Sequence, residues 1–132
     1  MEIAIPPGSA YVGIVRLAVG SLARSAGFDE ERVDEIRIAV SEACTNAVLT
    51  NDEAGSAEAI AISWREESDH IVVEVGDRGA SPEQQPSAAD SQGFAPRLVM
   101  SVALLRELVD DLSFDPRPGG GTLTRLTFSR AG

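Results

Sequence analysis

The sequence predicts an α+β fold of the two-layer sandwich type, with a mostly antiparallel sheet and helices on one of its faces. Short runs in which every second residue is apolar, as in strands, lie near both ends of the chain and in its middle. Longer segments carry apolar residues every three or four positions, as in helices. The expected order is strand, helix, helix, two strands, loop, helix, two strands. Strands and helices are thus partly segregated, which favours this fold class.

Composition limits the kind of protein. The chain has 132 residues, 43% of them apolar, so we expect one domain over residues 1–132 with a real core. Neither an apolar run long enough to span a membrane nor a signal peptide is evident, and we expect a cytoplasmic protein with no membrane contact. The formal charge of −10 argues against direct, nonspecific binding of nucleic acid.

All eleven basic residues are arginines. A Walker A loop and a eukaryotic-type kinase both need a lysine on the phosphates, so these two modes of nucleotide binding are excluded. The single cysteine, Cys44, falls on an apolar helix stripe and is expected to be a small core residue. His70 is the only histidine, and nothing near it suggests a metal site or a phosphorelay.

In the first half, we expect an edge strand over residues 1–5 and a helix over about 9–26. A long helix follows over about 29–51, in which Asp29 is a good N-cap. Its apolar stripe consists of Val33, Ile36, Val40, Cys44 and Ala47.

In the second half, alternating residues predict a hairpin with strands near 60–64 and 71–75. A polar loop over 80–93 comes next, then a helix over about 96–110. Its apolar face carries Leu98, Val102, Leu105 and Val109. Strands near 112–115 and 122–129 close the chain.

Glu42 and Asn46 lie four residues apart on the long helix, opposite its apolar stripe, so their side chains are neighbours. Apolar residues share this back face, which indicates a helix covered on both sides. A carboxylate and an amide buried there need a partner. Hydrated Mg²⁺, which prefers oxygen ligands, is one candidate. The alternative is a half-exposed helix end on which both side chains are merely solvated.

Two glycine-containing turns are further candidates. Asp77 and Gly79 follow the second strand of the hairpin, and Gly121 and Thr122 precede the last strand. From the residues alone, the Asp77 stretch is interpreted as an ordinary turn, and the glycine run before Thr122 could be only a hairpin loop.

These stretches together carry a resemblance. The run Ser41-Glu42-Ala43-Cys44-Thr45-Asn46-Ala47 resembles the N-box of the Bergerat-fold ATPase and kinase superfamily. Its form is most similar to that of the anti-sigma-factor serine kinases of the SpoIIAB and RsbW type. The Asp77-Arg78-Gly79 stretch resembles the G1 box of that superfamily, and Gly120-Gly121-Thr122 resembles its G3 box. The resemblance runs through nearly the whole chain in order.

The resemblance implies roles for these residues. Asn46 would coordinate Mg²⁺, and Glu42 would be the general base on the attacking hydroxyl. Asp77 would accept the exocyclic amine of adenine and so reject guanine, which presents an acceptor there. Thr122 would help to fix the base. The remaining implied residues are Gly79, Gly93 and Gly121 at the nucleotide, a lid loop over about 80–95, and Arg16 in protein partner contacts.

The same resemblance implies the function. We expect a homodimeric anti-sigma factor that sequesters an RNA polymerase sigma factor. If its site is catalytically intact, we expect it to phosphorylate a serine of an anti-anti-sigma partner with Mg-ATP. The sequence departs from the pattern where Ala80 replaces a G1 glycine and Gly93-Phe94-Ala95-Pro96 replaces the G2 box. Proline lacks an amide donor, which favours the alternative of a non-catalytic partner-binding module with a degenerate nucleotide site. An unrelated small α+β domain is the third possibility.

Overall fold

A computed structural model of the chain describes residues 1–79 and 94–130, with side chains from Arg97 onward in the second range. The predicted lid over 80–95 therefore lies almost wholly outside the described residues, and so does Gly93. Within the described part of the chain, no helix is both long and apolar enough to cross a membrane.

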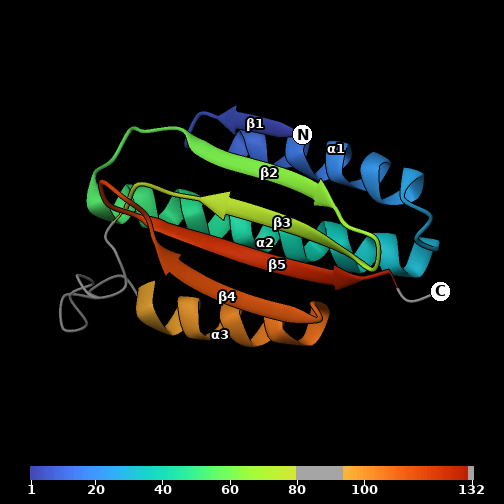
Figure 1. Cartoon of the computed structure of the whole chain (residues 1–132). Coiled ribbons are helices and arrows are strands. Elements are labelled where there is room, and N and C mark those ends of the chain that lie inside the picture. The colour runs from blue at the N-terminus through green and yellow to red at the C-terminus, as the bar shows by residue number, and fades with distance from the viewer. Residues whose placement is uncertain (80–93, 131–132) are drawn as a thin grey trace.

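The sheet has five strands in the order β1-β2-β3-β5-β4, with every neighbouring pair antiparallel (Figure 1). The strands are β1 (Glu2–Ile5), β2 (Ile60–Glu66), β3 (His70–Gly76), β4 (Asp111–Pro116) and β5 (Thr122–Ser129). The expected edge strand, the hairpin and the closing pair of strands are thereby confirmed. Because β3 and β5 pair directly, the residues that follow β3 lie beside those that precede β5.

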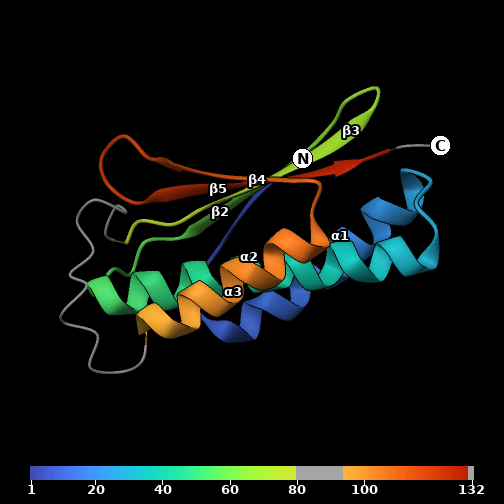
Figure 2. The same cartoon turned by 90° about the horizontal axis from the view of Figure 1, so that it is seen from below.

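The helices cover one face of this sheet, as the view from below in Figure 2 shows. They are α1 (Val12–Ser25), preceded by a 3₁₀ turn (Ser9–Tyr11), α2 (Glu30–Ala54) and α3 (Phe94–Leu108). Helix α2 contacts both other helices and strands β2, β3 and β5. The predicted two-layer α+β sandwich is confirmed, and α2 is the helix around which it is assembled.

The ends of α2 follow from local chemistry. The Asp29 carboxylate accepts a hydrogen bond of 2.8 Å from the Arg32 amide, as an N-cap should. At the other end, Gly55 adopts φ 70°, a left-handed conformation typical of a helix C-cap. The helix therefore ends at Ala54, three residues beyond the predicted Asn51, because the polar run after Asn51 carries no earlier left-handed residue.

The predicted stripe of α2 lies in the core, and Cys44 is fully buried. On the back face, Ala39 and Val48 are also buried, whereas Ile38 remains 39% exposed. The inner face of the sheet supplies the other wall of the core, mainly Ile60, Ile62, Trp64, Ile71, Val73, Leu126 and Phe128. The helix is therefore enclosed over most of its second half, where the motif residues lie.

Helix α3 begins at Phe94, two residues before the predicted start at Pro96. Proline is tolerated in the first turn of a helix because its missing amide has no intrahelical partner there. The Phe94-Ala95-Pro96 stretch is thus helical, which differs from an open glycine-rich loop.

Candidate functional site

A cavity of about 230 Å³ lies between α2, α3 and the sheet. Asn46 and Thr50 reach it from α2, Asp77 from the end of β3, and Thr122 from the start of β5. Its remaining lining is mostly apolar: Ala43, Ala47, Leu98, Val102, Leu105, Phe114 and Thr124. Residues from three separate motifs thus meet at one place.

Asp77 is the most deeply buried charged group of the cavity, with 4% of its surface exposed. Its Oδ1 accepts hydrogen bonds from the backbone amides of Gly79, at 3.0 Å, and Thr122, at 3.2 Å. Burial raises the pKa of the carboxyl, although both amides and two nearby arginines act in the opposite direction. Both of these amides donate to Oδ1, so Oδ2 is the oxygen that can accept a hydrogen bond from a ligand.

Gly121 allows the two motif turns to touch. Its φ is +101°, and a Cβ there would lie 2.1 Å from the Asp77 carbonyl oxygen. The next residue, Thr122, accepts a 3.0 Å hydrogen bond from the Asp77 amide through its carbonyl oxygen. A glycine is therefore required at Gly121 both for the backbone conformation and for the close approach.

Gly79 is required for a different contact. A Cβ at Gly79 would lie 2.4 Å from Thr50 Cγ2 and 2.6 Å from the Thr50 carbonyl oxygen. The turn after β3 is thus pressed against the last turns of α2. This contact brings Thr50, itself 6% exposed, to the same end of the cavity as Asp77.

Glu42 and Asn46 are half-buried, and both are hydrogen-bonded to Ser101 of α3. The Ser101 hydroxyl donates to Glu42 Oε2 at 2.9 Å and accepts from Asn46 Nδ2 at 2.6 Å. Ser101 is 7% exposed. The two side chains are therefore joined through a third residue, which excludes the alternative that they are merely solvated.

Sequence reasoning did not identify Ser101. The available signal was a polar residue within the apolar face of α3, because Ser101 lies three residues after Leu98 and four before Leu105. Leu98, Val102 and Leu105 of that face line the cavity, and Leu105 also belongs to the core.

The residues on α2 form a line. Glu42, Asn46 and Thr50 are spaced four apart, so about 6 Å of helix axis separates each from the next. Exposure falls along this line, from half-buried Glu42 and Asn46 to buried Thr50. The site thus has a closed end near Asp77 and a more accessible end near Glu42.

Asn51 is a structural residue of the site, at the position where the long helix was predicted to end. It is fully buried; its Oδ1 accepts from the Arg78 amide at 2.9 Å, and its Nδ2 donates to the Glu58 carbonyl oxygen at 2.9 Å. The residue therefore ties the end of α2 to the turn that carries Asp77. Its only signal was an amide within a turn-like composition, which did not separate it from surface asparagines.

One predicted site residue lies elsewhere, and a second is not described. Arg16 is exposed on α1 and does not line the cavity. Gly93 falls outside the described residues.

The side chains at the accessible end fit a magnesium ion. Asn46 and Glu42 carry an amide oxygen and a carboxylate, which are hard ligands of the kind that Mg²⁺ prefers. No group of three or more His, Cys, Asp or Glu side chains suited to a metal occurs among residues 1–79 and 94–130. A site for Mg²⁺ would therefore need waters and ligand phosphates to complete it.

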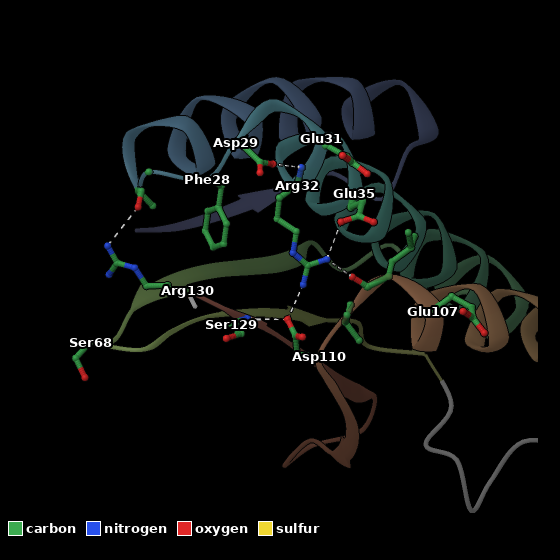
Figure 3. Close-up of a pocket in the computed structure, with 14 residues that line it drawn as sticks. Phe28, Asp29, Glu31, Arg32, Glu35, Ser68, Glu107, Asp110, Ser129 and Arg130 are labelled. Atoms are coloured by element: carbon green, nitrogen blue, oxygen red, sulfur yellow. Dashed lines mark hydrogen bonds and ion pairs between the residues drawn. The ribbon is translucent and has the colours of Figure 1, made fainter. Parts of the chain in front are cut away.

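A larger hollow of about 800 Å³ lies near the opposite end of α2 (Figure 3). Arg32 is at its centre and donates to Glu35, at 3.0 Å, to the Leu108 carbonyl oxygen, at 2.8 Å, and to Asp110. The Asp110 carboxylate also accepts from the Ser129 amide at 2.7 Å. These charges are bonded to one another, so the cluster joins α2 to the α3–β4 connection. Size alone does not make this hollow the functional site.

The sheet is antiparallel and helices cover one of its faces, with a cavity between the two layers that has the Asp77 carboxylate at its closed end. This arrangement is typical of the class of ATP-binding domains related to histidine kinases. Residues 5–128 match the histidine kinase-like ATPase domain. The chain belongs to this family.

Its relatives agree with the resemblance seen in the sequence. A serine-protein kinase RsbW of Oceanobacillus iheyensis is 28% identical over 130 residues, which cover 90% of this chain and 80% of the relative. The RsbW of Bacillus subtilis is 31% identical over 96 residues, 73% of this chain and 60% of the relative. With the RsbW of Halalkalibacterium halodurans, at 37% identity, the match spans about half of the relative's length (49%). The resemblance to RsbW-type proteins is confirmed.

A solved structure supports the fold independently of sequence. The structure of the SiaB–SiaC complex from Pseudomonas aeruginosa matches 97% of this chain and 88% of the chain compared, with a TM-score of 0.69. The two chains share 13% identity, so the likeness concerns the fold alone.

Proposed function

We propose that the chain is an anti-sigma factor that binds Mg-ATP and phosphorylates a serine of an anti-anti-sigma partner. The observation that carries the proposal is the cavity in which Asn46, Asp77 and Thr122 meet, one helical turn from Glu42. The family and the relatives named serine-protein kinase support the same activity.

The closed end of the cavity suits adenine. The cavity volume of about 230 Å³ is smaller than the roughly 300–1,000 Å³ of pockets that enclose a whole ligand. We therefore place the adenine base inside the cavity and the phosphates outside it. Asp77 Oδ2 would accept the exocyclic amine of adenine, and Thr122 would support it by a further hydrogen bond. Guanine presents a carbonyl oxygen at that position, which a carboxylate repels.

The accessible end suits the phosphates and the metal. Phosphates near the Glu42 carboxylate would repel it, and a divalent cation offsets that repulsion. Asn46 would hold the ion through its amide oxygen. When bound, Mg²⁺ neutralises charge that develops on the transferred phosphoryl group.

Glu42 is the base in this proposal. Its carboxylate takes the proton of the acceptor serine, the serine Oγ forms a bond to the γ-phosphorus, and the bond from that phosphorus to the β,γ-bridging oxygen breaks to release ADP. A positioned carboxylate contributes roughly 100- to 10,000-fold to such a proton transfer.

Partner binding is assigned to the surface of α1 around Arg16. Ile14 and Leu17, which flank it, are 58% and 71% exposed, and an arginine among exposed apolar side chains is typical of protein interfaces. We propose that a sigma factor binds this surface and that the protein is a homodimer. Arg16→Ala should weaken binding of the sigma factor without changing ATP affinity, as measured by calorimetry.

A non-catalytic binding module is the second candidate, because one observation favours it. Phe94, Ala95 and Pro96, which stand where the G2 box is expected, form the first turn of α3. In that case the fold would sequester a partner without transferring phosphate.

The test is titration calorimetry of ATP, with and without Mg²⁺, on the wild type and on Asn46→Ala. We expect saturable binding whose Mg²⁺-dependent part is lost in the variant. Absence of heat and of thermal stabilisation at millimolar ATP would refute the kinase and leave the binding module. Incubation with ATP and candidate partner proteins, followed by mass spectrometry of the partner's serines, then tests transfer itself.

A further inference from the structure

Ser101 is the residue on α3 that contacts both Glu42 and Asn46. Its hydroxyl has one donor and two acceptor positions. The donor is used on Glu42 Oε2, at 2.9 Å, and an acceptor position is used on Asn46 Nδ2, at 2.6 Å. Ser101 is 7% exposed, so water has little access to compete for these bonds.

The hydroxyl also decides how the Asn46 amide is oriented. With the amide turned round, its oxygen and Glu42 Oε2 would both need the single proton of Ser101, and one acceptor would lack a donor. The arrangement with Nδ2 toward Ser101 satisfies all three groups. It turns the amide oxygen of Asn46 away from Ser101 and leaves Glu42 Oε1 unengaged by this hydroxyl.

We infer that Ser101 is a positioning residue, which presents the Asn46 amide oxygen to Mg²⁺ and holds the Glu42 carboxylate for proton transfer. The inference rests on the proposed function. Residues that orient a metal ligand through a hydrogen bond typically change metal affinity by about 10- to 100-fold when they are removed. Ser101 belongs to α3 and the pair to α2, so the position of α3 controls the geometry of the metal site.

The inference predicts a specific pattern of nucleotide affinities. Asp77 and Thr122 are separate from Ser101, so binding of ATP in EDTA should be the same in Ser101→Ala and in the wild type, within about twofold. The gain in affinity on adding Mg²⁺ should fall by about tenfold or more. Ser101→Thr, which keeps the hydroxyl, should retain most of the gain, and Ser101→Cys, a weak hydrogen-bonding group of similar size, should lose it.

A matched control is Ser63→Ala. Ser63 also donates to a glutamate, Glu74 Oε1, at 3.4 Å, but on the sheet and away from the cavity. This variant should keep both the affinity in EDTA and the gain with Mg²⁺. Urea midpoints show whether each variant is folded. If Ser101→Ala is unfolded, the comparison of Ser101→Cys with Ser101→Thr tests the same point.

The outcomes separate the inference from the proposed function. A wild type without any nucleotide binding overturns both. A wild type with Mg²⁺-dependent binding that Ser101→Ala and Ser101→Cys retain overturns the inference alone. Phosphate found on Ser101 itself after incubation with Mg-ATP also overturns the inference, because the Ser101 hydroxyl would then be the group that receives the phosphate. Loss in Ala and Cys with retention in Thr supports it.

Discussion

Asp77→Asn tests how the site would recognise its base. The substitution keeps the size of the side chain and leaves an oxygen that can accept from the Gly79 and Thr122 amides, as Oδ1 does now. It replaces Oδ2, an acceptor, by an amide nitrogen, which is a donor. If adenine binds as proposed, its exocyclic amine then faces another donor.

The size of the effect follows from two losses. A hydrogen bond to a charged group contributes roughly 1.5–3 kcal/mol, and a buried donor left without an acceptor costs about 1–3 kcal/mol. The smaller values add to about 2.5 kcal/mol, which corresponds to a factor of about 60 in affinity. We therefore expect ATP to bind at least about 50-fold more weakly, whereas GTP, with an acceptor at that position, should lose less or gain.

Asp77→Asn should weaken ATP binding but raise the free energy of unfolding at neutral pH. Burial raises the pKa of Asp77, so its contribution to the free energy of unfolding is fully present at acidic pH, below the unfolded carboxyl's pKa, and is lost as pH rises through the raised value. An asparagine does not titrate. Relative to the wild type, the variant should therefore gain stability from acidic to neutral pH.

The assay is calorimetry of ATP and GTP, with urea unfolding at several pH values. Asp115→Asn, an exposed carboxylate on β4, is the control for the loss of one negative charge. Unchanged ATP affinity in a folded Asp77→Asn protein would refute the assignment of Asp77 to the base. A variant that loses stability relative to the wild type between acidic and neutral pH would refute the argument from burial.

Three further predictions concern the residues that hold the site together. Gly121→Ala should destabilise the protein by more than about 3 kcal/mol, because it adds a clash with Asp77 to a strained φ. Gly120→Ala is the control: at φ +105° with nothing within 4 Å of the added Cβ, it should cost only about 1–2 kcal/mol, and equal urea midpoints of the two variants would contradict the prediction. Asn51→Ala removes a buried side chain and leaves the half-buried Arg78 amide and the Glu58 carbonyl without these partners. It should lower the free energy of unfolding by about 1–3 kcal/mol, and an unchanged urea midpoint would show that water replaces the asparagine. Burial raises the pKa of the Cys44 thiol to about 12, so the native protein should not react with a thiol reagent at pH 8 but should react once unfolded; rapid native reaction would disprove its burial.

The elements of the fold were largely predictable because their signals are local. The N-cap at Asp29, the alternating strands and the helical spacing of α3 each depend on neighbours along the chain. The errors were at element ends, as at Ala54 and Phe94, where the polar composition after Asn51 and the proline at position 96 looked like boundaries. Helix α2 continues to the left-handed Gly55, and helix α3 begins two residues before Pro96, which places the proline in its first turn.

The candidate site was predictable only as separate pieces. The resemblance identified Glu42, Asn46, Asp77 and Thr122, and the structure brings the last three to one cavity with Glu42 joined to it through Ser101. Asn51 was not recognisable, since an asparagine in a polar run has the same local pattern whether it is buried or solvated. Its role depends on groups 7 and 27 residues away along the chain.

The sequence by itself determined what is local: which segments are helices and strands, that nucleotide binding through a phosphate-binding lysine is excluded, and which short motifs are candidates for a site. Only the tertiary structure decided how these motifs are joined. The pairing of β3 with β5 sets Asp77 against Gly121, and the packing of α3 on α2 places the Ser101 hydroxyl between Glu42 and Asn46. Both contacts connect residues more than 40 positions apart, whose proximity depends on the packing of the whole sheet and its helices.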